Sequence, residues 1–368
     1  MGVQQLQPLP IRDLSGGMIS NIADVLLPPN IARYSQNFHF DVLGRTTQRY
    51  GTTLAGAVVE ASQTCHGVHA FVSSDGATNR LISVFNKNTY HFDGTTWTNF
   101  GSTSSTAKVR FASFLNSVFS VGGGTTTRTW AGSGAWGTTN VSGAPTGNVI
   151  AIYKEKAFIA GYDTYPDRVY FSSVPSTTNT ITWTSTDWID VNPEDGDNIT
   201  ALFANSDLLF MFKERGFYTY NNSTVNPVVG IGTSSQESVA ECKGFVFFFN
   251  SGGIFVTSGG YPREISRPVY DWIANMSPSF YDDVAAFCDD DHYFCSIGDV
   301  TKGGRTYSNV WLVYTVSSQN WTIFTFADSF RAMTRYIVPS TGAVSYVGGD
   351  VDGAVQTFFS GTTDNGTS

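Results

Sequence analysis

The side chains that could do chemistry in this chain are mostly carboxylates, and their densest group lies late in the sequence. Asp282-Asp283 is followed by Asp289-Asp290-Asp291 and then by His292. Calcium binds several oxygen ligands at about 2.3–2.6 Å, and an Asp-rich loop supplies such ligands, so Asp289, Asp290 and Asp291 are candidate calcium ligands. The same residues separate two short apolar segments, Phe287-Cys288 and Tyr293–Cys295. A solvated turn in a tight hairpin is therefore the favoured interpretation.

Other patterns of a catalytic or metal centre are missing from the sequence. The second acidic loop, Pro193–Asn198, is not followed by the Glu that ends a calcium-binding loop. His66 and His69 lie three residues apart in a strand-like stretch and so face opposite sides. The four cysteines form no Cys-x-x-Cys pair, and buried free thiols are favoured over a disulfide. Serine-nucleophile, zinc-protease and Walker motifs are absent. We expect no catalytic residue, no cofactor and no bound metal.

One turn leaves an enzymatic alternative open. Phe92–Trp97 contains part of the Asp-box turn of sialidases, but it lacks the Ser two residues before Asp93 and the Gly two residues after it, and it occurs once. A glycosidase also needs a pair of carboxylates, which the sequence does not assign. A glycosidase is therefore the second alternative to a function without catalysis.

The composition indicates an all-β chain. The 368 residues are 14% aromatic and only 14% charged, and they include 37 Gly. Aromatic and β-branched residues favour pleated, half-buried surfaces over long helices. No basic and apolar leader is present at the start, and no apolar run approaches the length of a membrane span. The net charge of −9 argues against a dedicated nucleic-acid binder, although an acidic wall would let DNA pass without binding it.

Strand-like segments recur with a nearly constant spacing after residue 65. Alternating apolar stretches are separated by clusters of Gly, Asn, Asp, Ser and Thr, and Asp93-Gly94 is a strong hairpin signal. Successive units start near residues 66, 109, 149, 199, 238, 284 and 330, in steps of 39 to 50 residues. A period of about 40–50 residues with about four strands is typical of a β-propeller blade. We predict a propeller of about six to seven blades over residues 51–368. A pair of β-sandwiches or a β-helix would not sustain this period.

Residues 1–50 differ from the repeats and are predicted to form an extended arm. Four prolines and the turn Ser15-Gly16-Gly17 interrupt this stretch, and Asn30–Asn37 is compatible with one short helix capped by Asn30. The last repeat is short of a strand, and a propeller ring closes best when both termini contribute to one blade. The segment Thr46–Val59 is the predicted donor of that strand.

Three stretches resemble a known family. The first is Leu14–Met18 with Leu27-Pro28-Pro29, Ala32–Asp41 and Arg45–Gly51. The second is Asp167–Ser172 with Trp188–Val191, Asp195–Leu202 and Leu208–Tyr218, and the third is Gly244–Phe255. Together they resemble the nozzle and tail-hub (stabilisation) β-propeller proteins of short-tailed phages. Within the second stretch, Lys213 and Arg215 are expected to flank Glu214 in a solvated turn at a blade edge.

The resemblance implies a structural role in the virion. It implies a homo-oligomer, usually a sixfold ring, placed below the portal and adaptor in the phage tail and assembled in the host cytoplasm. DNA would only pass through, and no membrane is involved. Family members often continue past a Thr-Asp-Asn-Gly element, so a chain ending at Ser368 is expected to serve as a ring or adaptor. The arm is the candidate for contacts with neighbouring subunits or tail proteins, through its apolar residues Leu14, Leu27, Tyr34, Phe38 and Phe40.

A binding function remains the first alternative. Two turns rich in Trp, Trp130–Trp136 and Asp93–Trp97, are expected to be exposed and would then suit a carbohydrate- or receptor-binding propeller.

Overall fold

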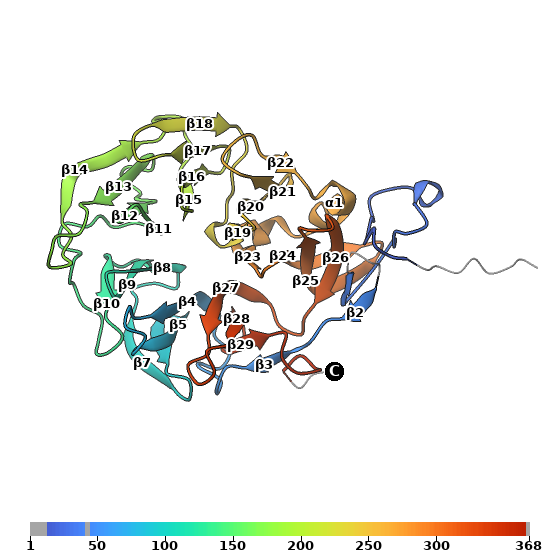
Figure 1. The fold of residues 1–368 in the computed structure, drawn as a ribbon, viewed down its shortest axis with the longest axis horizontal. Helices are drawn as coiled ribbons and strands as arrows, with labels where there is room; N and C mark the ends of the chain where they lie inside the picture. Colours follow the sequence, from blue (N-terminus) through green and yellow to red (C-terminus); the bar gives the residue numbers. More distant parts are fainter. Residues whose placement is uncertain (1–12, 41–44, 366–368) are drawn as a thin grey trace, which may run out of the picture.

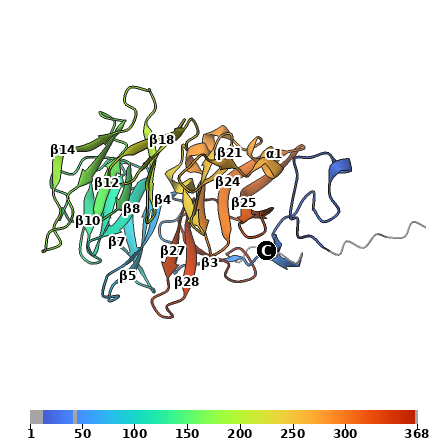
Figure 2. The ribbon, with the colours of Figure 1, turned by 45° about the horizontal axis from the view of Figure 1, so that its top comes forward.

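Seven antiparallel β-sheets, called blades 1–7 below, surround a common axis in the computed structural model, which describes residues 13–40 and 45–365 (Figure 1). The sheets follow one another around the ring in sequence order, and the first strand of each blade lies innermost (Figures 1 and 2). The chain is thus an all-β, seven-bladed β-propeller. In the described residues the innermost strands begin at residues 65, 109, 149, 199, 240, 285 and 330, which confirms the predicted period.

The strands of the first four blades have the following bounds. Blade 1 contains β4 (Cys65–Val72), β5 (Asn79–Phe85), β6 (Asn88–Phe92) and β7 (Trp97–Ser102). Blade 2 contains β8 (Val109–Phe114), β9 (Ser117–Gly122) and β10 (Arg128–Trp130). Blade 3 contains β11 (Val149–Tyr153), β12 (Lys156–Ala160), β13 (Arg168–Ser172) and β14 (Trp183–Asp190). Blade 4 contains β15 (Ile199–Ala204), β16 (Leu209–Lys213), β17 (Phe217–Tyr220) and β18 (Val225–Val229).

Among the remaining blades, blades 5 and 6 are preceded by short helical turns. Blade 5 contains β19 (Ala240–Cys242), β20 (Phe245–Asn250), β21 (Gly253–Thr257) and β22 (Arg263–Glu264). Blade 6 contains β23 (Ala285–Cys288), β24 (His292–Lys302), β25 (Arg305–Thr315) and β26 (Asn320–Thr325). Blade 7 contains β27 (Phe330–Ile337), β28 (Val344–Asp350) and β29 (Val355–Phe358). The connecting turns are η2 (Gln236–Ser238), η3 (Arg267–Val269), α1 (Tyr270–Ile273) and η4 (Pro278–Asp283). No helix in the described residues is long and apolar enough to cross a bilayer.

The hydrophobic core lies between the blades. Within the described residues, each of the seven interfaces between neighbouring blades has its own cluster of buried side chains. Between blades 6 and 7, for example, Phe287 and Trp311 pack against Phe330 and Phe358. A sheet buried on both faces explains why the strands read as continuous apolar runs, such as Phe245–Asn250.

Blade 7 is completed by the N-terminal part of the chain. The strand β3 (Thr52–Leu54) pairs antiparallel with β29, with Thr52 opposite Phe358, and lies in the segment from which we expected the closing strand. Asp364 then forms a parallel bridge with Thr52. An N-terminal segment and the last described residues therefore meet at blade 7, and the pairing of β3 covers the outer edge of β29.

The described part of the arm lies along the outer edge of blade 6. A two-stranded hairpin, β1 (Phe38–Phe40) and β2 (Thr46–Gln48), follows a stretch in which Gln36 forms a parallel bridge with Ile323 of β26. The amide of Met18 donates to the carbonyl of Trp321, and the Met18 side chain is only 1% exposed. The helix expected at Asn30–Asn37 is therefore wrong. The helical turn of the described arm is η1 (Asp24–Leu26). In Asn30–Asn37 the backbone instead forms isolated bridges, Ala32 with Met18 and Gln36 with Ile323 of β26.

Candidate functional site

The five arm residues predicted as interface candidates fall into different environments. Tyr34 and Phe38 are 42% and 44% exposed, whereas Leu14 and Leu27 are half-buried. Phe40 is only 4% exposed, so its side chain packs inside this chain and offers little surface to a partner. Tyr34 also stacks on Trp272 of α1, with ring centroids 6.2 Å apart. The arm thus contacts its own propeller with some apolar residues and exposes others.

The most exposed large hydrophobic side chain of the described residues, Val25, is in this arm, and neither it nor its neighbour Leu26 was among the candidates. Val25 and Leu26, in η1, are 90% and 65% exposed. They belong to the segment 20–31, called the η1 loop below, which protrudes beyond blade 6 (Figure 1). The run Val25-Leu26-Leu27 before two prolines was the available sequence signal.

Arg49 joins the arm, blade 6 and the C-terminal segment. Its guanidinium donates two hydrogen bonds to the Asp364 carboxylate, at 2.8 and 2.7 Å, and a third to the Asn37 side chain at 3.0 Å. It also lies over the ring of Phe326, 4.1 Å from the centroid. The Arg49 and Asp364 side chains are 8% and 14% exposed, so this bidentate pair is largely shielded from water. It fixes the arm next to the strand that closes the ring.

The acidic candidates for calcium form the turn between β23 and β24. Asp289 accepts a hydrogen bond from the Asp291 amide at 2.7 Å and pairs with His292 Nδ1 at 3.0 Å, while Asp291 pairs with Lys243 and Ser317. Burial raises the pKa of Asp289, but the contacts with His292 outweigh it and lower the pKa overall. Asp290 is exposed. Among the described residues, no group of three or more His, Cys, Asp or Glu side chains is arranged to hold a metal ion.

A pocket of about 460 Å³ lies between the arm hairpin and blade 6. Its walls include His39, Phe40 and Tyr50 from the arm and Asp289, His292 and Phe294 from blade 6. The rings of His39 and His292 are 5.2 Å apart. Burial and the neighbouring His292 lower the pKa of His39 to about 4, so its imidazole is neutral at pH 7. The pocket therefore combines aromatic walls with a few polar groups.

An ion-pair network crosses the axis of the propeller. Arg110 on β8 contacts the Glu237 carboxylate at 2.9 and 3.1 Å, and Lys108 contacts the same group at 3.4 Å. Lys108 also pairs with Asp283 at 3.3 Å, and Asp283 pairs with Arg331 of blade 7 at 2.9 Å. Burial raises the pKa of Glu237, but Arg110 and Lys108 outweigh burial and lower the pKa to about 2. The network links blades 2 and 7 to the turns that precede blades 5 and 6.

The axial cavity beside this network is small. It has a volume of about 180 Å³ and is lined by the innermost strands of blades 1, 2, 3, 6 and 7. Its wall includes Arg110 and Glu237 themselves. Side chains therefore occupy the axis at this level.

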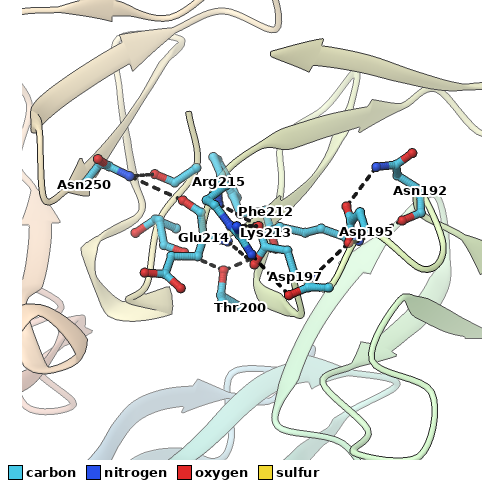
Figure 3. A network of polar contacts seen from close by, with 12 residues as sticks. Asn192, Asp195, Asp197, Thr200, Phe212, Lys213, Glu214, Arg215 and Asn250 are labelled. Carbon is cyan, nitrogen blue, oxygen red and sulfur yellow. Dashed lines mark hydrogen bonds and ion pairs between the residues drawn. The ribbon is translucent and has the colours of Figure 1, made fainter. Parts of the chain in front are cut away.

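The second stretch of the family resemblance forms a buried polar network between blades 3 and 4 (Figure 3). Lys213 is 1% exposed, and its ammonium contacts Asp167 at 2.6 Å, Asp195 at 2.7 Å and the Asn192 carbonyl at 3.1 Å. Burial lowers the pKa of Lys213, but the two carboxylates outweigh it and raise the pKa overall. The contact with Lys213 likewise lowers the pKa of Asp195 against the effect of burial.

Asp197 completes this Lys213 network at the next turn. Its carboxylate accepts hydrogen bonds from the amides of Glu214 at 3.2 Å and Arg215 at 2.8 Å (Figure 3). The expectation of a solvated charged turn is therefore wrong for Lys213 and right for Arg215, whose side chain is 72% exposed. The Asp and Lys residues of the motif connect two blades.

The Trp-rich turns that suggested carbohydrate binding are packed against the propeller. Trp130 is 1% exposed, and its indole nitrogen donates to the Gly134 carbonyl at 2.9 Å. Trp97 is half-buried, stacks on Phe92 and donates to the Ala55 carbonyl at 2.8 Å. The expectation that Trp130 would be exposed is wrong, because its ring fills the interface between blades 1 and 2.

Comparison with known proteins supports the fold and leaves the family open. No protein-family model matches the sequence, and no curated protein matches it. Among solved structures, the N-terminal part of BBS1, solved in complex with ARL6, is 10% identical over 84% of this chain and 97% of that one, with a TM-score of 0.53.

Two bacterial proteins share the architecture to a similar degree. The extracellular domain of the putative hybrid two component system BT4673 from B. thetaiotaomicron is 10% identical, with a TM-score of 0.53, over 84% of this chain and 40% of that one. PorZ of Porphyromonas gingivalis, a component of the type-IX secretion system, is 12% identical, with a TM-score of 0.51, over 85% of this chain and 38% of that one. The chain thus spans less than half of these two proteins. At such identities the similarity shows the β-propeller fold alone.

Proposed function

We propose that this chain is a structural component of a bacteriophage tail, a nozzle, hub or adaptor ring below the portal that lines the path of DNA exit. The proposal starts from the resemblance of the arm and of the second and third stretches to phage tail propellers. It includes no catalytic step and no cofactor. Its partners are further copies of the chain, in a ring expected to be sixfold, together with the portal, the adaptor and other tail proteins.

The observation that carries the proposal is the combination of a blocked axis and a projecting arm. The axial cavity of about 180 Å³ is crossed by the Arg110–Glu237 pair, so duplex DNA cannot pass through one propeller. A DNA path must then lie between several copies, which requires a closed ring with heterologous interfaces. The η1 loop supplies exposed apolar surface for such contacts.

Rigidity and charge support the same role. The Lys213 network connects blade 3 to blade 4, and the axial network connects blades on opposite sides of the ring. A conduit must keep its shape while DNA moves, and these contacts hold the blades together. The net charge of −9 means that the chain as a whole repels phosphate, which favours passage of DNA over binding.

Electron microscopy of the full chain and of tail particles that contain it tests the proposal. We expect closed rings with an opening that admits duplex DNA, and density for the ring below the portal in the particle. Copies of the chain that never join a particle, or that join it away from the DNA path, contradict the tail role.

A second candidate function is binding of a carbohydrate or another receptor. The observation that favours it is the pocket of about 460 Å³ between the arm hairpin and blade 6, where the exposed ring of Tyr50 stands beside Asp289 and His292. Binding to a glycan array that is lost in Tyr50→Ala would support this candidate. Its absence, together with ring assembly, favours the tail role.

A further inference from the structure

The η1 loop is held in place at its base and exposed at its tip. The amide of Ala32 donates to the Gly17 carbonyl at 2.8 Å, and that of Ile19 donates to the Ala32 carbonyl at 3.0 Å. The amides of Ser20 and Asn21 both donate to the Pro268 carbonyl, at 2.9 and 3.1 Å. A loop fixed in this way loses little further freedom when a partner binds it. None of the residues that the structure describes covers its tip, since Val25 is 90% exposed and Leu26 65%.

A second exposed apolar feature lies on the outer surface between blades 5 and 6. A groove of about 270 Å³ is walled by Phe245 and Tyr261, which are 45% and 72% exposed. Its floor is formed by buried side chains that include Phe247 and Tyr314. A cavity of about 150 Å³ accommodates a benzene molecule, so this groove has room for two aliphatic side chains.

The charges of the two features are complementary. Arg263 lines the groove and is exposed, and it takes part in none of the ion pairs found among the described residues. Asp24 stands directly before Val25 in the η1 loop, and its side chain is 85% exposed although it contacts Arg33 at 3.1 Å. One contact between loop and groove would therefore cover both apolar features and give Arg263 an anion.

We propose that the η1 loop of one copy of this chain docks into the groove between blades 5 and 6 of a second copy, with Val25 and Leu26 on the aromatic walls and Asp24 beside Arg263. When the loop of each copy docks into the groove of the next copy, the contact is head-to-tail and closes into a ring if the rotation allows it. The inference rests on the self-assembly in the proposed function and identifies the surfaces that carry it.

Sedimentation velocity of the full chain over a range of concentrations tests the contact. We expect the double variant Val25→Asp with Leu26→Asp to weaken self-association about tenfold or more. Asp24→Lys and Arg263→Glu should each weaken it about threefold to fivefold, and their combination should restore it to near the wild-type level. The matched control is Val174→Asp, at a side chain that is 53% exposed in blade 3, which should leave association unchanged.

Further controls separate the possible explanations. Arg33→Gln removes the partner of Asp24 within the same chain and should not weaken association, and melting curves of all variants verify the fold. The proposed contact is overturned if the wild-type chain stays monomeric at about 100 µM, a concentration at which even weak contacts assemble. It is also overturned if the double variant associates like the wild type, or if combining Asp24→Lys with Arg263→Glu does not restore association. The tail role is judged separately, by the position of the chain in the particle, so a ring built through other surfaces contradicts only this inference.

Discussion

Replacement of Lys213 by Met tests whether the charged motif between blades 3 and 4 is a buried structural network. Met is unbranched and apolar and fills much of the space of the Lys side chain, so the change mainly removes the ammonium. Removing one partner of a buried ion pair costs about 3–5 kcal/mol. Asp167 and Asp195 are 17% and 22% exposed, so water compensates part of this loss. We expect the free energy of unfolding to fall by about 2–4 kcal/mol.

The corresponding shift in melting temperature follows from the chain length. With an unfolding entropy of about 2.1 cal/mol/K per residue, a chain of 368 residues has about 0.8 kcal/mol/K. A loss of about 3 kcal/mol then lowers the melting temperature by about 4 °C, measured by calorimetry at a fixed scan rate. The matched control is Lys243→Met, which breaks a pair whose Lys side chain is 46% exposed and should cost under about 1 kcal/mol.

The pH dependence provides an independent measurement of the same network. The pKa of Asp195 is lowered in the folded protein, so its contribution to stability is present above the ordinary Asp pKa and is lost as the pH falls through the lowered value. The difference in free energy of unfolding between the wild type and Lys213→Met should therefore become smaller as the pH falls below about 4. Adding Asp167→Asn and Asp195→Asn to Lys213→Met should recover much of the lost stability. The reasoning is refuted if Lys213→Met loses no more stability than Lys243→Met. It is also refuted if the stability lost in Lys213→Met does not change with pH.

Three further predictions concern the axis, the ring closure and the thiols. Glu237→Gln should lower the free energy of unfolding by about 2–3 kcal/mol at pH 7, since Arg110 and Lys108 lose their anion. The difference in stability from the wild type should vanish as the pH falls through about 2, which melting curves recorded over a range of pH measure. Deletion of residues 1–60 removes β3 and should increase hydrogen exchange in Val355–Phe358, whereas deletion of residues 1–45 should not. Equal exchange rates in the two deletion variants contradict the role of β3. Burial raises the pKa of Cys65 and Cys295 to about 12, so both should resist alkylation at pH 8 until the protein unfolds, and rapid labelling of the native protein contradicts this.

Local sequence patterns were sufficient to predict the blades. Turn residues such as Asp93-Gly94 and the alternation of apolar segments act over a few residues, so they place strands without knowledge of the partner strands. The hairpin around Asp289–Asp291 is an example, since β23 ends at Cys288 and β24 begins at His292. The prediction of about six to seven blades left the number open, because one spacing fits both, and the structure shows seven.

The arm shows where local patterns are insufficient. Asn30–Asn37 has an acceptable helix start, yet it forms no helix because Gln36 pairs with Ile323, which lies almost three hundred residues later. The outcome was decided by the free edge of β26, which no pattern inside the arm reveals.

The sequence by itself determined an all-β repeat, the spacing of its units and the segment from which ring closure comes, because these depend on short-range turn chemistry and alternation. Tertiary structure alone decided the environment of the charged residues. Lys213 lies in a polar run that is typical of a solvated turn, but Asp167 and Asp195 of the neighbouring blade enclose it. Glu237 likewise meets Arg110 only across the propeller axis. The free energy of a charged side chain depends on its exposure to solvent and on the charges around it. Residues distant in sequence determine both the exposure and the neighbouring charges.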